Sequence, residues 1–129
     1  MAKGNNQKLK LLYLTKIFME KTDESHALTL AEITAQLNAY EVTADRKTLY
    51  LDFEELKRYG LDIVSEQCGK TVVYHLASRQ FELAELKLLV DSVQSAKFIT
   101  EKKSNSLIKK LESLVSEHEA KQLHRQVIT

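Results

Sequence analysis

The stretch VTADRKTLYLDFEELKRYG, residues 42–60, predicts a helix and the side on which that helix is buried. Leu49, Phe53 and Leu56 recur at positions i, i+4 and i+7, so they lie on one narrow face of an α-helix. Most of their neighbours are charged or hydrogen-bonding side chains, which favour solvent. We therefore expect a helix that packs against a core through this narrow face alone.

The ends of this helix follow from residues with known capping preferences. Thr43 is expected to cap its start, because a threonine hydroxyl accepts a hydrogen bond from a backbone N–H of the first turn. Gly60 is expected to end it, since glycine readily adopts the left-handed conformation that follows many helices. The predicted helix thus covers about residues 43–59.

The outward surface of the predicted helix is cationic near its N-terminus. The side chains that point away from the apolar face are Lys47, Leu51, Glu54 and Arg58, and those that flank this outward side are Arg46, Tyr50 and Lys57. A helix that enters the major groove of DNA contacts it with residues of its first turns. Glu54 and Glu55 would repel phosphate, so contact is expected in the first two turns only. We expect Asp52 to be structural and to pair with a basic residue of another helix.

Two further helices are expected before this one. Residues 9–18 repeat apolar side chains at helical spacing, and the stripe consists of Leu11, Leu12, Leu14, Ile17 and Phe18. Thr29 and Glu32 form a capping-box pattern, in which each side chain accepts a hydrogen bond from the other residue's backbone N–H. A second, short helix is therefore expected to follow Thr29 and to end near Asn38.

A β-hairpin is expected after the quoted stretch. The runs LDIVSEQ and TVVYHLA are rich in β-branched residues and are separated by CGK, which predicts a wing over about residues 62–77 with Gly69 and Lys70 at its tip. We expect His75 on the surface of this wing. Three helices followed by a hairpin is the element order of a winged helix-turn-helix. The expected fold is mainly α with a small β-hairpin, a winged helix-turn-helix over residues 1–78 followed by a helical extension.

Residues 79–129 return to helical periodicity and form this extension. Apolar stripes predict two helices, the second capped by Thr100, and Ser116 and Glu119 form a capping box for a short terminal helix through Leu123. A winged domain need not cover these stripes. We therefore expect the helices to dock on that domain, on each other, or across a homodimer that would match a palindromic operator.

Composition bounds the class of protein. A chain of 129 residues fits one domain, or one small domain with an appendage. The single cysteine, Cys68, and the lack of a signal peptide indicate the reducing cytoplasm, and no apolar run is long enough for a membrane span. A net charge of +1 excludes a bulk polycation but allows local patches, such as the five lysines within residues 1–22.

Signatures of enzymes and metal sites are missing from the sequence. His118 and Glu119 begin an HE pair, but a zinc helix needs a second histidine where Gln122 stands. The other histidines and Cys68 lack partners at ligand spacing, and the three glycines are isolated, so no phosphate loop occurs. We expect no catalytic residue, no metal and no cofactor.

Two functions of different classes fit this pattern. The first is sequence-specific binding of double-stranded DNA, in which Arg46 and Lys47 reach base edges or phosphates. The full set of expected DNA-binding residues is Thr43, Arg46, Lys47, Thr48, Tyr50, Leu51, Arg58 and Lys70. The alternative is a winged-helix protein–protein interaction module that does not bind DNA. The discriminating feature is whether Arg46, Lys47 and Lys70 share one face.

The segment RKTLYLDFEELKRYGLDIV resembles the recognition helix and first wing strand of WYL-domain transcriptional regulators. Their pattern runs roughly Arg-(Arg/Lys)-Thr-Ile-Tyr-x-Asp-Ile-x-x-Leu, then Gly and an apolar strand. The resemblance continues through VVYHLASRQFELAELKLLVDSVQSAKFITEKKSNSLIKKLESL and so covers nearly the whole chain. It implies an N-terminal winged helix-turn-helix that binds DNA and a C-terminal domain that senses an effector.

Two features depart from that family pattern. Many members carry arginine at the position of Leu51, so one expected phosphate or base contact is absent here. An exposed leucine would instead meet a thymine methyl group or pack on a partner. The sequence also ends at Thr129, before any WYL domain, in a truncated or a short natural form. The sensing function is therefore not expected in these residues, and the extension would serve docking, dimerisation or linkage to the missing domain.

Overall fold

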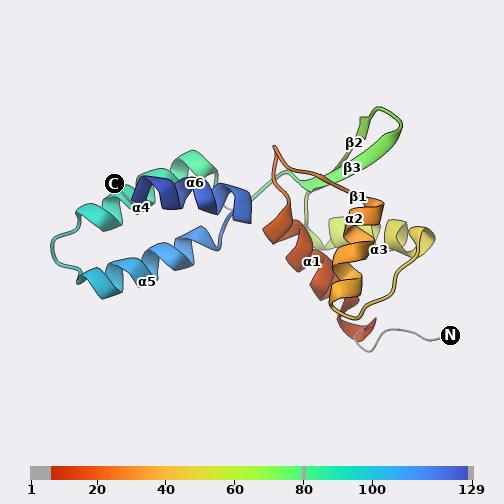
Figure 1. The fold of residues 1–129 in the computed structure, drawn as a ribbon, viewed down its shortest axis with the longest axis horizontal. Coiled ribbons are helices and arrows are strands. Elements are labelled where there is room, and N and C mark those ends of the chain that lie inside the picture. The colour runs from red at the N-terminus through yellow and green to blue at the C-terminus, as the bar shows by residue number, and fades with distance from the viewer. Residues whose placement is uncertain (1–6, 80, 128–129) are drawn as a thin grey trace. The chain divides into compact units, whose positions relative to one another are not determined.

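The computed structural model describes residues 7–79 and 81–127, with the side chains of the last helix described as far as His124. The chain divides into two compact units, residues 1–78 and 79–129 (Figure 1). Each unit has its own apolar core. Within the described residues, no helix is both long and apolar enough to cross a membrane.

The first unit has the predicted mainly helical fold with a small antiparallel sheet. Its elements are the 3₁₀ turn η1 (Gln7–Leu9), α1 (Lys10–Lys21), β1 (Leu28–Thr29), α2 (Leu30–Ala39), α3 (Arg46–Tyr59), β2 (Ile63–Cys68) and β3 (Thr71–Leu76). Three helices thus precede a β-hairpin, as in a winged helix-turn-helix. The two-residue loop between β2 and β3 begins with Gly69, whose φ of +66° suits the tip of the wing.

The sheet has three strands, where the sequence predicted two. The additional strand β1 pairs antiparallel with β3, with Leu28 opposite Tyr74, so that β3 lies between β1 and β2. Two residues are too few to show an alternating pattern, which is why β1 escapes sequence analysis. His75, expected on the wing surface, is 8% exposed, because three successive residues of β3, Tyr74, His75 and Leu76, are buried and both faces of the strand are therefore covered at this end.

The core of the first unit forms around the predicted narrow face of α3. Leu49, Phe53 and Leu56 are at most 5% exposed. The Phe53 ring contacts Phe18 of α1 edge-on at a centroid distance of 5.4 Å and Tyr74 of β3 at 5.0 Å. The third helix is therefore fixed between the first helix and the wing.

The buried stripe of α1 is narrower than the sequence predicted. It consists of Leu14, Ile17 and Phe18, whereas Leu11 and Leu12 are 41% and 68% exposed. Leu12 lies about 160° around the helix from Leu14, at 100° per residue, and so faces away from the core.

The second unit is a three-helix cluster formed by α4 (Leu83–Ser95), α5 (Glu101–Glu112) and α6 (Glu117–Val127). Its helices pack on each other around Leu86, Val90, Ile108, Val115 and Leu123. The hydroxyls of Thr100 and Ser116 accept hydrogen bonds from backbone N–H groups three residues later, as their capping patterns predicted. The last helix is longer than the expected stub, since it continues to Val127.

Helices α2 and α3 end in the same hydrogen-bond motif. In each, a residue that follows the helix has a positive φ, but this residue is a glycine in one case and a glutamate in the other. After α3, the N–H of Leu61 donates to the Leu56 carbonyl, and Gly60 adopts a φ of +134°. After α2, the N–H of Val42 donates to the Leu37 carbonyl, and the residue with positive φ, +63°, is Glu41. A side chain at such a position costs about 1–2 kcal/mol.

We predict opposite effects of exchanging side chains at these two helix ends. Glu41→Gly should raise the free energy of unfolding of the first unit by about 0.5–1 kcal/mol, because it relieves the left-handed strain. Gly60→Ala should lower it by about 1–2 kcal/mol through backbone conformation alone, since nothing lies within 4 Å of the added Cβ.

Tyrosine fluorescence during denaturation measures this unit selectively. All five tyrosines lie within residues 1–78, at positions 13, 40, 50, 59 and 74. Glu41→Ala is the matched control, because it removes the charge but keeps a Cβ. A gain in Glu41→Ala as large as that in Glu41→Gly would assign the effect to charge and not to backbone strain.

Candidate nucleic-acid interface

The start of α3 differs from the predicted one by three residues and has a different cap. The helix begins at Arg46, and Asp45 is its N-cap: the Asp45 carboxylate accepts a hydrogen bond of 2.9 Å from the Thr48 N–H. Thr43, the expected cap, instead donates its backbone N–H to the Gln7 side-chain carbonyl at 2.9 Å. The prediction was wrong because both residues are good caps locally, and Gln7, distant in sequence, binds one of them.

The first two residues of α3 present free cationic side chains. Arg46 and Lys47 are both exposed, and within residues 7–79 and 81–124 no carboxylate forms an ion pair with either. An exposed, unpaired cation retains its full charge for an external anion, because no internal ion pair must be broken first. Leu51, one turn further along, is 61% exposed, as the helical wheel predicted.

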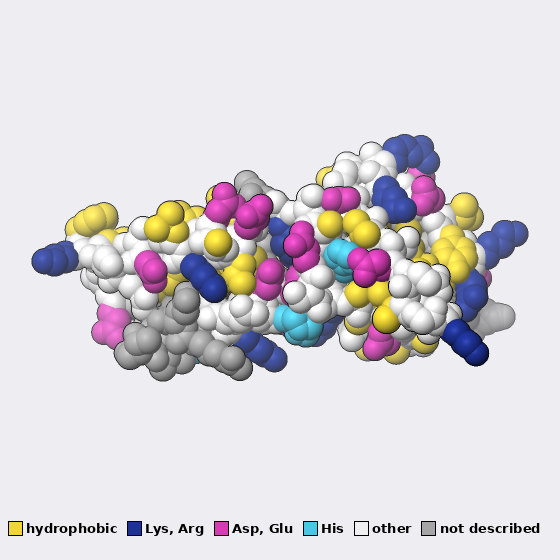
Figure 2. All heavy atoms as spheres, turned by 90° about the horizontal axis from the view of Figure 1, so that it is seen from above, with side chains coloured by type: hydrophobic (Ala, Val, Ile, Leu, Met, Phe, Trp, Pro, Cys, Tyr) yellow, Lys and Arg dark blue, Asp and Glu magenta, His cyan; other side chains and the backbone are white. Residues whose placement is uncertain are grey.

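A groove joins the start of α3 to the tip of the wing. Its volume is about 340 Å³, and its lining residues are Thr29, Leu30, Ala31, Arg46, Tyr50, Lys70, Thr71, Val72 and Tyr74. Arg46 and Lys70 therefore face one hollow, although they come from different elements. Lys47 adjoins Arg46 in the chain but is not among the lining residues. Lys and Arg side chains, dark blue, lie along the outer edge of this unit on the right of Figure 2.

Two tyrosines, Tyr50 and Tyr74, line this groove. Burial raises the pKa of the Tyr74 hydroxyl, and its interaction with the Tyr50 hydroxyl adds to this, whereas the nearby Arg46 opposes it. The Tyr74 hydroxyl thus stays protonated at neutral pH and is able to donate a hydrogen bond. Tyr50 is 44% exposed, so part of its side chain is accessible from outside.

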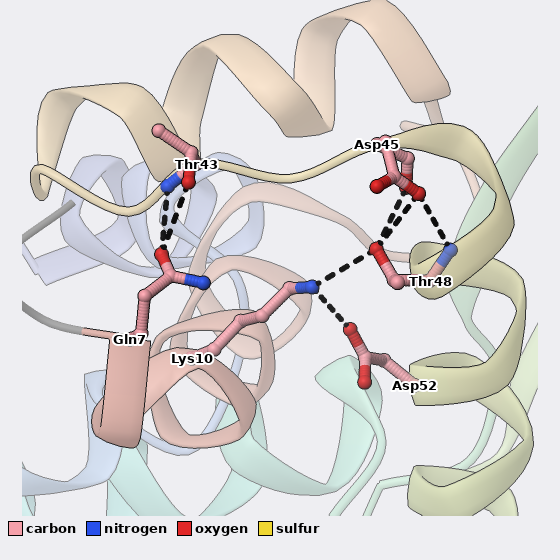
Figure 3. Close-up of polar contacts among 6 residues, drawn as sticks. All are labelled: Gln7, Lys10, Thr43, Asp45, Thr48 and Asp52. Carbon is pink, nitrogen blue, oxygen red and sulfur yellow. Dashed lines mark hydrogen bonds and ion pairs between the residues drawn. The ribbon is translucent and has the colours of Figure 1, made fainter. Parts of the chain in front are cut away.

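The two threonines predicted to contact phosphates are engaged within the protein (Figure 3). The Thr48 hydroxyl lies 3.0 Å from Asp45 Oδ1 and 3.1 Å from the Asp45 carbonyl oxygen. It has a single proton to donate, so donation to a phosphate would break its own hydrogen bond to Asp45. The Thr43 hydroxyl lies 3.4 Å from Gln7 Oε1. Both residues therefore fix the local backbone.

The last turns of α3 are neutralised by ion pairs. Lys57 lies 3.1 Å from Glu54, and Arg58 pairs with Glu55. Arg58 was predicted to assist binding, but the structure brings it to a carboxylate three residues earlier and not to the groove. Cationic side chains without a carboxylate partner are thus found at the start of α3 and not in its final turn.

A polar contact between α1 and α3 confirms the role predicted for Asp52. Lys10 Nζ lies 2.8 Å from Asp52 Oδ2, as an ion pair and not as an aligned hydrogen bond, and it also donates to Thr48 Oγ1 at 3.3 Å (Figure 3). The sequence did not identify Lys10, Gln7 or Asp45 as part of this region. The helical wheel gave no signal for the first two, because their partners are more than thirty residues away.

Comparison with known proteins adds no assignment to this geometry. The chain matches no protein-family model, no curated protein and no solved structure.

The N-cap of α3 predicts a pH dependence of stability. Hydrogen bonds from the Thr48 N–H and hydroxyl hold the pKa of Asp45 below its ordinary value of 3.8, and the Lys10 ammonium adds to this. A carboxyl group whose pKa is lowered in the folded state stabilises that state above its unfolded pKa. The contribution disappears as the pH falls from about 4 through the lower folded pKa.

Asp45→Asn should therefore reduce the loss of stability between pH 5 and pH 3, because asparagine caps a helix without titrating. Denaturation followed by tyrosine fluorescence at several pH values measures this. Glu24→Gln, at an exposed acid outside the helices, is the control, and its stability should depend on pH as that of the parent protein does. An unchanged profile in Asp45→Asn would show that the cap carboxylate does not titrate as described.

Proposed function

We propose that the first unit is a sequence-specific DNA-binding module of a transcriptional regulator. In this proposal α3 enters the major groove with its N-terminal turns, and the wing formed by β2 and β3 contacts the phosphate backbone. Arg46 and Lys47 read base edges or anchor on phosphates, and Lys70 contacts the backbone from the wing.

The observation that carries the proposal is the groove shared by Arg46 and Lys70. DNA requires cations on the reading helix and on the wing to face the same way, because both elements contact one duplex. A winged helix that only docks on proteins has no such requirement. Tyr50 lines the same groove and can donate to a phosphate oxygen.

The acids of α3 limit the proposed contact to its N-terminal half. Glu54 and Glu55 are exposed, but Lys57 and Arg58 neutralise them within the helix. The wing meets α3 in the groove at Arg46 and Tyr50, which belong to its first two turns. The proposed site therefore consists of Arg46, Lys47, Tyr50, Leu51 and Lys70, with Thr43 and Thr48 as supporting residues and Arg58 outside it.

The resemblance of residues 46–64 to WYL-domain regulators supports the same proposal. That family's pattern places Arg46, Lys47 and Tyr50 on the outward side of the reading helix, and the structure leaves the first two exposed and unpaired. Leu51 departs from the pattern and is exposed, so it is suited to a thymine methyl group. We propose membership of this family for the module, acting in the cytoplasm.

The alternative, a docking module for another protein, is favoured by exposed apolar side chains on α3. Leu51 is 61% exposed and Tyr59 86% exposed, and both aromatic and aliphatic anchors are common in protein interfaces. Neither residue lines the groove that contains Arg46 and Lys70. The charge arrangement therefore favours DNA as the ligand of the groove.

For the second unit we propose homodimerisation, which would double the contacts on a palindromic operator. Its helices bury their own core but leave Leu88 68% exposed and Phe98 90% exposed. Large apolar side chains at this exposure are suited to an interface with a second copy.

The DNA proposal predicts a loss of binding when the free cations are removed. Duplexes enriched by the protein from a random-sequence library serve as ligands, and affinity is measured at several salt concentrations. Arg46→Ala with Lys47→Ala should weaken binding about a hundredfold, because each contact contributes about 1–3 kcal/mol. Lys70→Ala should weaken binding to all duplexes equally and lower the salt slope by about 1.

Lys57→Ala with Arg58→Ala is the matched control, since it removes the same charge from the paired end of the same helix. It should weaken binding clearly less than the Arg46/Lys47 variant, because Lys57 and Arg58 lie outside the proposed contact. Any loss would come from Glu54 and Glu55, which lose their partners but lie beyond the first two turns. Absence of binding at low salt, or an equal loss in both double variants, would contradict the proposed reading surface.

The dimer proposal predicts a concentration-dependent mass in light scattering coupled to size exclusion. Leu88→Ser with Phe98→Ser should shift the protein to a monomer, because it removes apolar area from the interface. Leu12→Ser is the control, at a residue of the first unit that is also 68% exposed. A parent protein that remains monomeric at its highest attainable concentration would rule out the dimer.

A further inference from the structure

Lys10 of α1 reaches α3 through two polar contacts. Its side chain is 13% exposed, because it extends between the first two turns of α3 (Figure 3). Nζ lies 2.8 Å from Asp52 Oδ2 and 3.3 Å from Thr48 Oγ1. By contrast, Lys16 of the same helix is 47% exposed and pairs with Glu20 one turn away.

Through Thr48, the Lys10 ammonium is connected to the cap of α3. The Thr48 hydroxyl and N–H both contact the Asp45 carboxylate, at 3.0 and 2.9 Å. On the other side of the loop, Gln7 accepts the Thr43 N–H. Two side chains of the N-terminal segment thus hold the backbone that leads into Arg46 (Figure 3).

We propose that Lys10 is a positioning residue for DNA recognition, which fixes the first turns of α3 and so determines sequence specificity without contacting DNA. The proposal rests on the function proposed above. The first N–H groups of a helix have no partner within it, so their positions depend on the cap and on what holds the cap. Readout of a base edge needs donors placed to within about 0.5 Å, and this is supplied by hydrogen bonds from residues behind them.

Direct contact of Lys10 with a phosphate is disfavoured by the same geometry. To reach outward, its ammonium would leave Asp52, whose side chain is 21% exposed. The carboxylate would then stand uncompensated on the helix that approaches DNA. The energetic cost of a partly buried, unpaired charge opposes such a movement.

The test removes the contact while conserving net charge. Lys10→Met with Asp52→Leu deletes both partners, so electrostatic attraction to DNA stays constant. Lys16→Met with Glu20→Leu is the matched control on the same helix, at an ion pair of 2.6 Å that does not involve α3. Lys10→Glu with Asp52→Lys reverses the pair and tests rescue. Each protein is titrated with the enriched duplex and with a scrambled duplex over a range of salt concentrations.

The Lys10/Asp52 deletion is expected to weaken binding of the enriched duplex about tenfold, with the scrambled duplex and both salt slopes unchanged. A loss confined to one sequence means that base readout and not phosphate attraction is affected. The reversed pair restores the ion pair but not the hydrogen bond that Lys10 donates to Thr48 Oγ1, so it should recover part of the loss. The Lys16/Glu20 control should bind like the parent protein. In the free protein, amide hydrogen exchange at Lys47 and Thr48 should be faster after the deletion.

Other outcomes overturn the inference in distinguishable ways. A salt slope lowered by about 1, with equal losses on both duplexes, would show that Lys10 contacts phosphate directly. Unchanged binding with reduced stability would show that the contact only holds the fold. If the parent protein binds neither duplex, the proposed function fails, and the positioning role fails with it.

Discussion

The narrow apolar face of α3 is the constraint on which the winged unit depends. A single column of Leu49, Phe53 and Leu56 anchors the helix, and the Phe53 ring contacts both α1 and β3. Packing along a single column determines the distance of the helix from the core, but by itself it restrains the orientation of the helix ends only weakly. The polar contacts of Lys10 and Gln7 supply the missing restraint at the N-terminal end, where the proposed readout takes place.

The ion pairs of α3 separate its two ends electrostatically. Lys57 and Arg58 are matched by acids within the helix, and Asp52 is matched by Lys10 from outside it. Exposed pairs of this kind add little to stability, so their main effect is to cancel charge locally. What remains is positive charge at the start of the helix, to which the wing adds Lys70 across the groove. A net charge of only +1 for the chain conceals this arrangement.

Local signals in the sequence predicted much of the fold. The buried column of α3, the capping box at Thr29 and the hairpin tip at Gly69 depend on residues a few positions apart, and all are observed. Strand β1 and the true cap Asp45 were missed, because β1 is defined only by pairing with β3, and Asp45 and Thr43 are equivalent until Gln7 binds one of them. Burial of His75 likewise depends on what covers the end of β3 away from the wing tip.

For the candidate site, the sequence by itself determined which side chains of α3 point away from the core, since helical periodicity assigns each residue a direction. The same periodicity predicted that Arg46, Lys47 and Leu51 are exposed and that Asp52 pairs with a basic residue of another helix. Only the tertiary structure decided that Arg46 and Lys70 share a groove, that Thr48 is committed to the helix cap and that the partner is Lys10. These pairings join residues far apart in the chain, so they depend on how the helices and the wing pack and not on any local pattern.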